Sequence, residues 1–218
     1  MLSNICSTIS RLKWLFVIIT VLYLLSITAG LITRFAGDGV FVSFVEKMDE
    51  GSNEQVEKIF GRFRQSVRDG DLKSIVLCSL IVFGVNTLGN ITSGTLPSIF
   101  ILPIGVTLLF GGWVQGISLG SIQASSFSSL FLFLLMGCLE WSTYVISSVV
   151  GVNIGLSVLI PKRQGVVSRW KAVKLAWRDA GRLYVVIVFI LAFQAVFEVL
   201  YVRKVLLMGG SAIPLMPY

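Results

Sequence analysis

The length of its apolar runs constrains this chain more than any other feature. The longest run, from Leu130 to Ile160, contains no proline and no basic residue, and Glu140 is its one acid. Over the whole chain 55% of the residues are hydrophobic, 13% are charged, and the mean hydropathy is +0.88. Soluble domains carry about 25% charged residues. The sequence therefore predicts an integral membrane protein, and the unbroken runs favour helices over the alternating pattern of a β-barrel.

The apolar runs predict an all-α, polytopic helical membrane protein with about five transmembrane helices, a sixth crossing being left open. The expected spans are Trp14–Ile32, Ser74–Ile91, Pro97–Leu119, one within Phe127–Ile160, and Leu183–Val202. A tight turn is expected at Thr92–Pro97, because its glycine and proline are typical of turns. We expect residues 1–218 to form a single helical membrane domain.

The segment Phe127–Ile160 is too long for one simple crossing. A straight helix of this length would reach about 50 Å, at about 1.5 Å per residue, against a hydrocarbon core of about 30 Å. It is either a long tilted helix or a re-entrant half-helix that breaks near Gly137 and continues as a full span. We favour the broken form. It would place Glu140 inside the bundle, since non-helical backbone at depth is tolerated only within protein or a wet cavity.

Polar side chains within the predicted spans form a candidate intramembrane polar site. Its members are Glu140, Asn86, Asn90, Gln115 and Asn153. An unpaired charge at the centre of a bilayer costs about 2.5 to 3.5 kcal/mol on insertion scales. Because no basic residue lies between Ser74 and Ile160, we expect Glu140 to be protonated or held by these amides rather than by a salt bridge. Its role is either structural or that of an ion or proton site.

Basic residues gather in one segment, Pro161–Arg182, where Asp179 is the one acid. They are Lys162, Arg163, Arg169, Lys171, Lys174, Arg178 and Arg182. Beside transmembrane helices such a cluster predicts the cytoplasmic side and contact with anionic lipid headgroups, rather than nucleic acid. The nearly neutral segment 34–73 is then extracytoplasmic. The predicted location is a cell membrane, with multiple spans and a cytoplasmic N-terminus.

Both segments outside the spans show helical apolar periodicity. In the outer one the apolar residues are Phe41, Phe44, Val45, Met48, Val56, Phe60, Phe63 and Val67, which predict two amphipathic helices on either side of Asp49–Asn53. This pair either packs on the bundle or forms a docking surface for a protein partner. In the inner segment Val167, Trp170, Val173, Ala176 and Trp177 alternate with basic residues, which predicts a helix in the headgroup region. Partner binding is the less favoured alternative for this segment.

Small residues recur at helical spacing in the centre of the chain. Gly112, Gly116 and Gly120 are four residues apart, as are Gly151 and Gly155, and Gly137 marks the expected break. Small residues on one face let two helix backbones approach closely in lipid. The pattern therefore predicts a glycine zipper that packs helices within one subunit, or at the seam of a homo-oligomer.

The residues that enzymes and metal sites need are scarce. The chain has no histidine, and its three cysteines, Cys6, Cys78 and Cys138, are far apart in sequence. This composition excludes His-based metal sites and catalytic triads and fits neither a zinc pattern nor a disulfide framework. No phosphate loop or dinucleotide fingerprint appears. We expect no enzyme, no metal and no cofactor.

Several motifs resemble the stage II sporulation protein M family. They are Asn86 in "FGVNTLGN", the turn "SGTL", then "QGISLG", and "GCLEWSTYVISSVVGVNIGLSVL", over about residues 75–160. The family typically has an Asn-Asn pair, an Asn-Gly followed by a glycine, and a Pro-His-Gly-x-x-Glu element. Here Asn86 stands alone, Gln115 replaces the asparagine, and Leu135 and Met136 replace Pro-His before Gly137 and Glu140.

The resemblance implies a membrane scaffold that recruits or organises protein partners. The family's namesake works with stage II sporulation proteins D and P, which remodel septal peptidoglycan. The residues themselves leave a second class open. Polar side chains at depth also fit a transporter or channel for a small solute, ion or lipid that uses the site around Glu140.

Overall fold

The computed structural model describes residues 2–37, 39–47, 61–100, 102–120 and 127–207, and over these ranges the chain is helical, without strands. The elements are α1 (Leu2–Ala36), a helix over residues 39–47, α3 (Arg64–Asp69), α4 (Leu72–Gly89), the π-helix η1 (Asn90–Thr95), α5 (Leu96–Ile99), α6 (Leu102–Gly120), α7 (Phe127–Leu159), the 3-10 helix η2 (Pro161–Gln164) and α8 (Arg169–Leu207). The predicted fold class, an all-α polytopic helical membrane protein, is confirmed.

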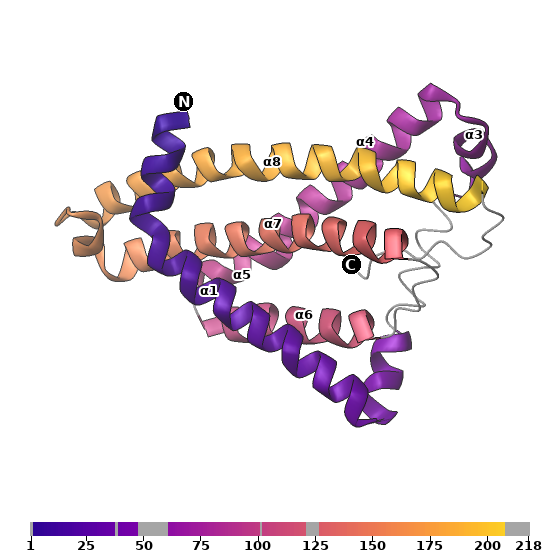
Figure 1. Cartoon of the computed structure of the whole chain (residues 1–218). Coiled ribbons are helices and arrows are strands. Elements are labelled where there is room, and N and C mark those ends of the chain that lie inside the picture. The colour runs from indigo at the N-terminus through magenta and orange to yellow at the C-terminus, as the bar shows by residue number, and fades with distance from the viewer. Residues whose placement is uncertain (1, 38, 48–60, 101, 121–126, 208–218) are drawn as a thin grey trace.

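The long helices run alternately between the two ends of the molecule (Figure 1). Among the described residues, four helical stretches are long and apolar enough to cross a membrane: Ser3–Ala36, Leu72–Ile99, Leu134–Leu159 and Arg169–Lys204. A shorter apolar stretch of α6, Leu108–Gly120, lies between them in the chain. Each helix forms because backbone groups in hydrocarbon must satisfy one another within the segment.

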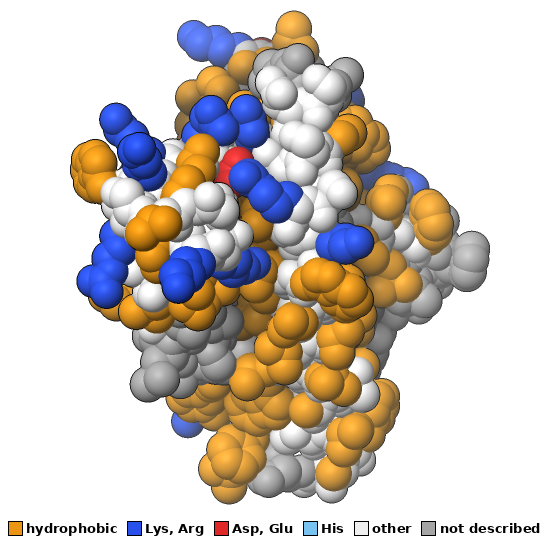
Figure 2. All heavy atoms as spheres, turned by 90° about the vertical axis from the view of Figure 1, so that its left-hand side faces the viewer, with side chains coloured by type: hydrophobic (Ala, Val, Ile, Leu, Met, Phe, Trp, Pro, Cys, Tyr) orange, Lys and Arg blue, Asp and Glu red, His pale blue; other side chains and the backbone are white. Residues whose placement is uncertain are grey.

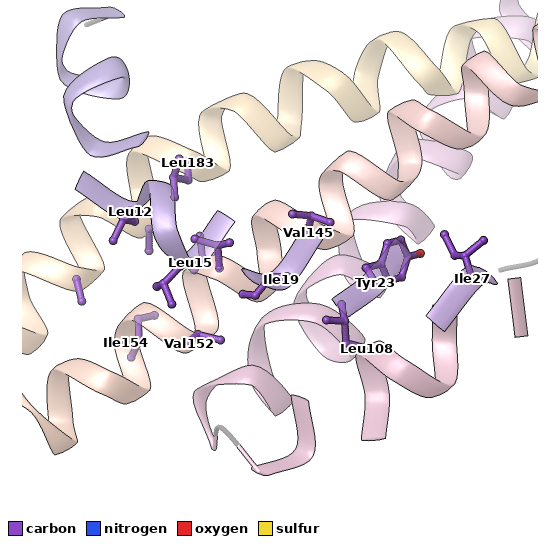
Figure 3. Packing of buried hydrophobic residues seen from close by; sticks show 14 residues of the cluster. Leu12, Leu15, Ile19, Tyr23, Ile27, Leu108, Val145, Val152, Ile154 and Leu183 are labelled. Carbon is purple, nitrogen blue, oxygen red and sulfur yellow. The ribbon is translucent and has the colours of Figure 1, made fainter. Parts of the chain in front are cut away.

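The main apolar core joins α1, α6, α7 and α8. From α1 it takes Leu12, Leu15, Ile19, Tyr23 and Ile27, which recur every three or four residues and so lie on one face (Figure 3). Leu108 of α6, Val145, Val152 and Ile154 of α7 and Leu183 of α8 pack against that face. The first helix is therefore an integral part of the bundle.

The expected break at Gly137 is wrong, because α7 is one continuous helix of 33 residues. Gly137 is buried, and the ring of Trp141, one turn further on, lies beside it. A glycine within a helix costs only about 1 kcal/mol relative to alanine, whereas a break in hydrocarbon would leave several backbone groups without partners. The long form of this segment, and not the re-entrant one, is the form that the structure shows.

The tight turn expected at Thr92–Pro97 is also wrong. Residues 90–95 form the π-helix η1, which continues through α5 to Ile99, so the next helix begins at Leu102 rather than Pro97. Hydroxyl groups support this irregular stretch. Thr92 donates to the Leu88 carbonyl over 2.8 Å, and Ser98 donates to the Gly94 carbonyl over 2.6 Å. The residues expected to form a turn are thus part of a helix. Hydroxyl groups of Ser and Thr side chains donate hydrogen bonds to its backbone carbonyl groups.

The inner amphipathic segment does not form a separate surface helix. Pro161–Gln164 is a short 3-10 turn that ends at Gly165 in the left-handed conformation, with φ of 71°. Residues 169–182 are the first part of α8, which runs without interruption for 39 residues. At about 1.5 Å per residue α8 is about 58 Å long, roughly twice the thickness of the hydrocarbon core. The helix is therefore long enough for its apolar second part to cross the hydrocarbon core while its basic first part lies outside it.

The described ends of the outer segment pack on the bundle. Val45 is buried against Val114 and Ile117 of α6, and Val67 of α3 is buried among residues of α4 and α8. The expected division at Asp49–Asn53, with Met48, Val56 and Phe60, lies outside the described residues.

Asp71 fixes the point at which α4 begins. Its carboxylate accepts hydrogen bonds from the Ser74 backbone N–H over 3.1 Å and from the Ser74 hydroxyl over 2.6 Å. These two bonds lower the pKa of the Asp71 carboxyl, the hydroxyl contributing more. This is the N-cap arrangement that satisfies an otherwise unpaired helical N–H group.

Candidate functional site

The end of the bundle where η2 and the start of α8 lie is strongly basic (Figure 2). Six of the seven predicted basic residues are exposed there: Lys162, Arg163, Arg169, Lys171, Lys174 and Arg178. Apolar side chains lie among them. Val167 is 86% exposed, Trp170 70% and Trp177 58%. We call this surface the basic end; it combines cationic groups with large apolar groups that nothing in the described chain covers.

Arg182 departs from the prediction, because it turns inward to Asp179. The Asp179 side chain is 1% exposed and pairs with two arginines, Arg11 of α1 and Arg182, whose guanidinium lies 3.6 Å away. Arg182 also donates to the Thr8 hydroxyl over 3.3 Å. The one acid of the basic segment therefore joins α8 to α1 instead of contributing to the surface.

Glu140 lies in the bundle interior, where its side chain is 2% exposed. The Tyr144 hydroxyl donates to its Oε1 atom over 3.2 Å, and the side chain of Gln194 on α8 forms a second hydrogen bond with it. Glu198 of α8 is close enough to act on it electrostatically. The donors that we expected are wrong: among the described residues, Tyr144 and the amide of Gln194 bond to Glu140. In the same described ranges, the amides of Asn86, Asn90, Gln115 and Asn153 do not.

Asn86 and Asn90 lie on consecutive turns of α4 and η1. Asn90 donates its amide N–H to the Asn86 backbone carbonyl over 3.0 Å, while its Oδ1 atom has no hydrogen-bond partner among the described residues. Within the described ranges, both side-chain polar atoms of Asn86 also lack a hydrogen-bond partner, although the residue is only 4% exposed. A buried amide without hydrogen bonds is costly, so these two residues call for an explanation.

The other two predicted polar residues belong to separate contacts. Gln115 of α6 accepts a hydrogen bond from the Tyr23 hydroxyl of α1. Asn153, near the end of α7, accepts one over 3.0 Å from Gln164 in η2, which also donates to Ser157 over 3.0 Å. Gln164 thereby folds the η2 turn back onto α7. Among the described residues, none of the four amides is hydrogen-bonded to Glu140, and the hydrogen bonds that they make lie elsewhere.

The glycines of α6 face α1. A Cβ atom added at Gly116 would lie 2.1 Å from the Ile27 carbonyl oxygen, and one at Gly112 would meet Tyr23 and Ser26. Gly120 lies against Arg34. On α7, Gly151 lies against Thr95 and Ser98, and Gly155 is buried. Gly137 was also in the predicted set, but the nearest atoms to a Cβ added there belong to the Trp141 ring of the same helix.

Sequence reasoning missed several residues of these contacts. Gln194 and Glu198 are four residues apart within the apolar stretch Leu183–Val202, so both face one side of α8. A polar pair at this spacing inside a span was a signal that could have identified them. Gly30 of α1, which meets Gly116, follows Ser26 by four residues, and this spacing of two small residues was a signal that could have identified it.

The fold and the intramembrane polar contacts define a polytopic helical membrane protein. The family model described as stage II sporulation protein M matches residues 14–201. The chain therefore belongs to the stage II sporulation protein M family, and the match extends well beyond the motifs at 75–160. This is not a known enzyme family. Neither the comparison with curated proteins nor that with solved structures gave a match.

Proposed function

We propose that this protein is a membrane scaffold that recruits a protein partner through its basic end. The observation that carries the proposal is the exposure of Trp170 and Trp177 among the arginines and lysines of the first part of α8. Tryptophan and arginine are the residue types most enriched where protein interfaces bind tightly. The chain also belongs to the stage II sporulation protein M family, and the resemblance to that family implies a scaffold role. Family membership therefore supports the same function.

Charge determines the kind of partner. Arg169, Lys171, Lys174 and Arg178 are exposed, whereas Asp179 is buried and already paired, so the surface of this stretch is cationic. A partner with acidic side chains and an apolar pocket for an indole ring complements it. We also propose that the same basic residues contact anionic lipid headgroups when no partner is bound, which assigns the basic end to the cytoplasmic face.

Site-specific photocrosslinking in native membranes tests the scaffold proposal. A photoreactive amino acid replaces Trp170 or Trp177, and Phe189 is the matched control, because it is an equally exposed aromatic on the apolar part of the same helix. The expected result is one discrete protein adduct from positions 170 and 177 that is absent from position 189. Changing Arg169, Lys171, Lys174 and Arg178 together to glutamine should abolish that adduct.

Lipid adducts alone at all three positions would contradict the scaffold proposal. The alternative function, transport of a small solute or ion, has a separate readout. Purified protein in vesicles without any partner would then carry solute across the membrane, and the change of the four basic residues to glutamine would not affect that flux.

A further inference from the structure

Two glutamates from neighbouring helices lie close together in the bundle interior. Glu140 of α7 is 2% exposed and Glu198 of α8 is 6% exposed, and Glu198 lies within electrostatic reach of Glu140. Both belong to stretches long and apolar enough to span a membrane. Among the described residues, the groups that act on Glu140 are Glu198, Tyr144 and Gln194, and none of them carries a positive charge. A carboxylate at such depth requires a compensating positive charge.

Gln194 adds a buried amide group whose nitrogen faces Glu140. It is 1% exposed and hydrogen-bonds to Glu140, while its Oε1 atom has no hydrogen-bond partner in the part of the chain that the structure describes. The amide nitrogen is therefore the atom that donates to Glu140, and the carbonyl oxygen remains beside the carboxylate. An unpaired acceptor next to a buried acid is unfavourable unless a cation or an additional proton occupies the space between them.

Asn86 of α4 lies at the same level of the bundle. Val82, one turn before it, packs with Ala195 and Val199 of α8. Because α4 and α8 run in opposite directions (Figure 1), the next turn of α4 lies beside the preceding turn of α8, which contains Gln194. Asn86 thus brings to this region a buried amide that has no hydrogen-bond partner among the described residues.

We propose that Glu140, Gln194 and Glu198 bind one small monovalent cation, a proton or Na⁺, between α7 and α8. Carboxylate and amide oxygens are hard ligands that suit Na⁺, and a carboxyl group that shares its site with a second acid readily takes up a proton. The bound cation neutralises Glu140 and stabilises the contact between the two helices. Occupancy then couples the packing of the bundle to pH or to the Na⁺ concentration. This inference does not depend on the scaffold proposal.

Other titratable groups surround the site, and an experiment must distinguish their effect on stability from that of the site. Tyr23 of α1 and Tyr144 of α7 both lie within electrostatic reach of Glu140, and α4 contributes Cys78 beside Val199. Arg203 of α8 lies further along, against Gly70. Measurements are therefore made in a Cys78→Ala background and in Glu140→Gln and Glu198→Gln variants of it, with Glu46→Gln as the control for loss of an exposed carboxylate.

Thermal stability of the purified protein in detergent distinguishes the two cations. Na⁺ is varied at constant ionic strength with choline as the replacement ion, and pH is varied at constant Na⁺. If Na⁺ binds, Tm should rise by about 3 to 5 °C for each tenfold increase in Na⁺ above the dissociation constant. If a proton binds instead, Tm should fall as pH rises, and Na⁺ should have no effect. Either response should disappear in Glu140→Gln and persist in Glu46→Gln.

The proposal is overturned if the parent shows neither response, or if Glu140→Gln and Glu198→Gln respond as the parent does. If Glu140→Gln does not fold, Glu198→Gln and infrared spectroscopy of the parent decide the question. A band of a protonated carboxylic acid that is lost on raising pH or on adding Na⁺, and is absent from Glu198→Gln, supports the site. A spectrum without such a band in the parent, together with a Tm independent of Na⁺, overturns it.

Discussion

Gly30 of α1 and Gly116 of α6 approach each other so closely that a Cβ atom built on either would lie 2.9 Å from a backbone atom of the opposite helix. The same added atom would lie 2.1 Å from a backbone carbonyl oxygen of that helix, the oxygen of Trp113 or of Ile27. Backbone atoms cannot move aside as a flexible side chain can. Glycine at both positions therefore sets the separation of these two helices, as expected where close packing and not the hydrophobic effect drives association in lipid.

Replacing Gly116 with leucine should separate α1 from α6 and destabilise the protein. Overpacking a close contact costs about 1 to 3 kcal/mol, and an obstruction by backbone atoms on the opposite helix places this site at the upper end of that range. The matched control is Gly111→Leu in the same helix, because an added Cβ at Gly111 meets nothing within 4 Å. Thermal unfolding in detergent should show a lower Tm for Gly116→Leu alone. Equal Tm values for the two variants would show that the α1–α6 contact is not close.

Replacing Asp179 with asparagine should weaken the connection between α1 and α8. Asp179 is buried and pairs with Arg11 and Arg182, so its loss leaves two partly buried guanidinium groups without their acid. Removing one member of a buried ion pair costs about 3 to 5 kcal/mol, and partial exposure of both arginines reduces the expected loss to about 2 kcal/mol.

The control for Asp179 is Glu46→Gln, which removes the exposed pair between Glu46 and Arg34 at 2.7 Å. Exposed pairs contribute at most about 1 kcal/mol. Chemical denaturation of both variants should therefore show the larger decrease for Asp179→Asn. A larger decrease for Glu46→Gln would refute the importance that we assign to the buried pair.

Asp71→Ala should lower stability at neutral pH and have no effect in strong acid. The Ser74 hydrogen bonds lower the pKa of Asp71 in the folded state below its ordinary value of 3.8. The stabilisation is therefore complete above about pH 4 and is lost as pH falls through the folded pKa. The Tm difference between Asp71→Ala and the parent, measured over a pH series, should shrink only at that acid end. A difference that persists below the folded pKa would mean that the charge of Asp71 does not contribute.

Cysteine labelling tests the proposed orientation of the bundle. In a variant that lacks Cys6, Cys78 and Cys138, one new cysteine is placed at exposed Lys171 in the basic end or at exposed Gln65 in α3. Basic residues are retained on the cytoplasmic side, so a membrane-impermeant reagent applied from outside should label position 65 but not position 171. Permeabilised cells should label both. Labelling of position 171 in intact cells would show that the bundle has the opposite orientation to the one proposed.

Much of the fold follows from sequence alone because secondary structure in a membrane is decided locally. An apolar run of spanning length must form a helix, whatever its neighbours are, since its backbone groups find no other partners in hydrocarbon. For the same reason the Thr92–Pro97 stretch, whose glycine and proline are typical of turns in water, did not end a helix here, and neither did the glycine at 137. Turn rules derived from aqueous proteins were the wrong guide at these two places.

The contacts between helices were beyond sequence reasoning, with one partial exception. The spacing of Gly112, Gly116 and Gly120 identified one face of α6, but not that α1 would supply Gly30 opposite to it. Glu140 was identified as an isolated acid, whereas Gln194 and Glu198, which act on it, come from a different helix far along the chain.

The sequence by itself determined the class of protein, the main helices and the segment that carries the surface charge. The tertiary structure decided which side of each helix faces another helix, and therefore which polar groups share a site. The physical reason is that a spanning helix apolar on all sides has no preferred face in lipid. Its rotation is set by backbone approach and by a few polar contacts, such as Arg11 with Asp179 and Gln194 with Glu140, which exist only after the helices have packed.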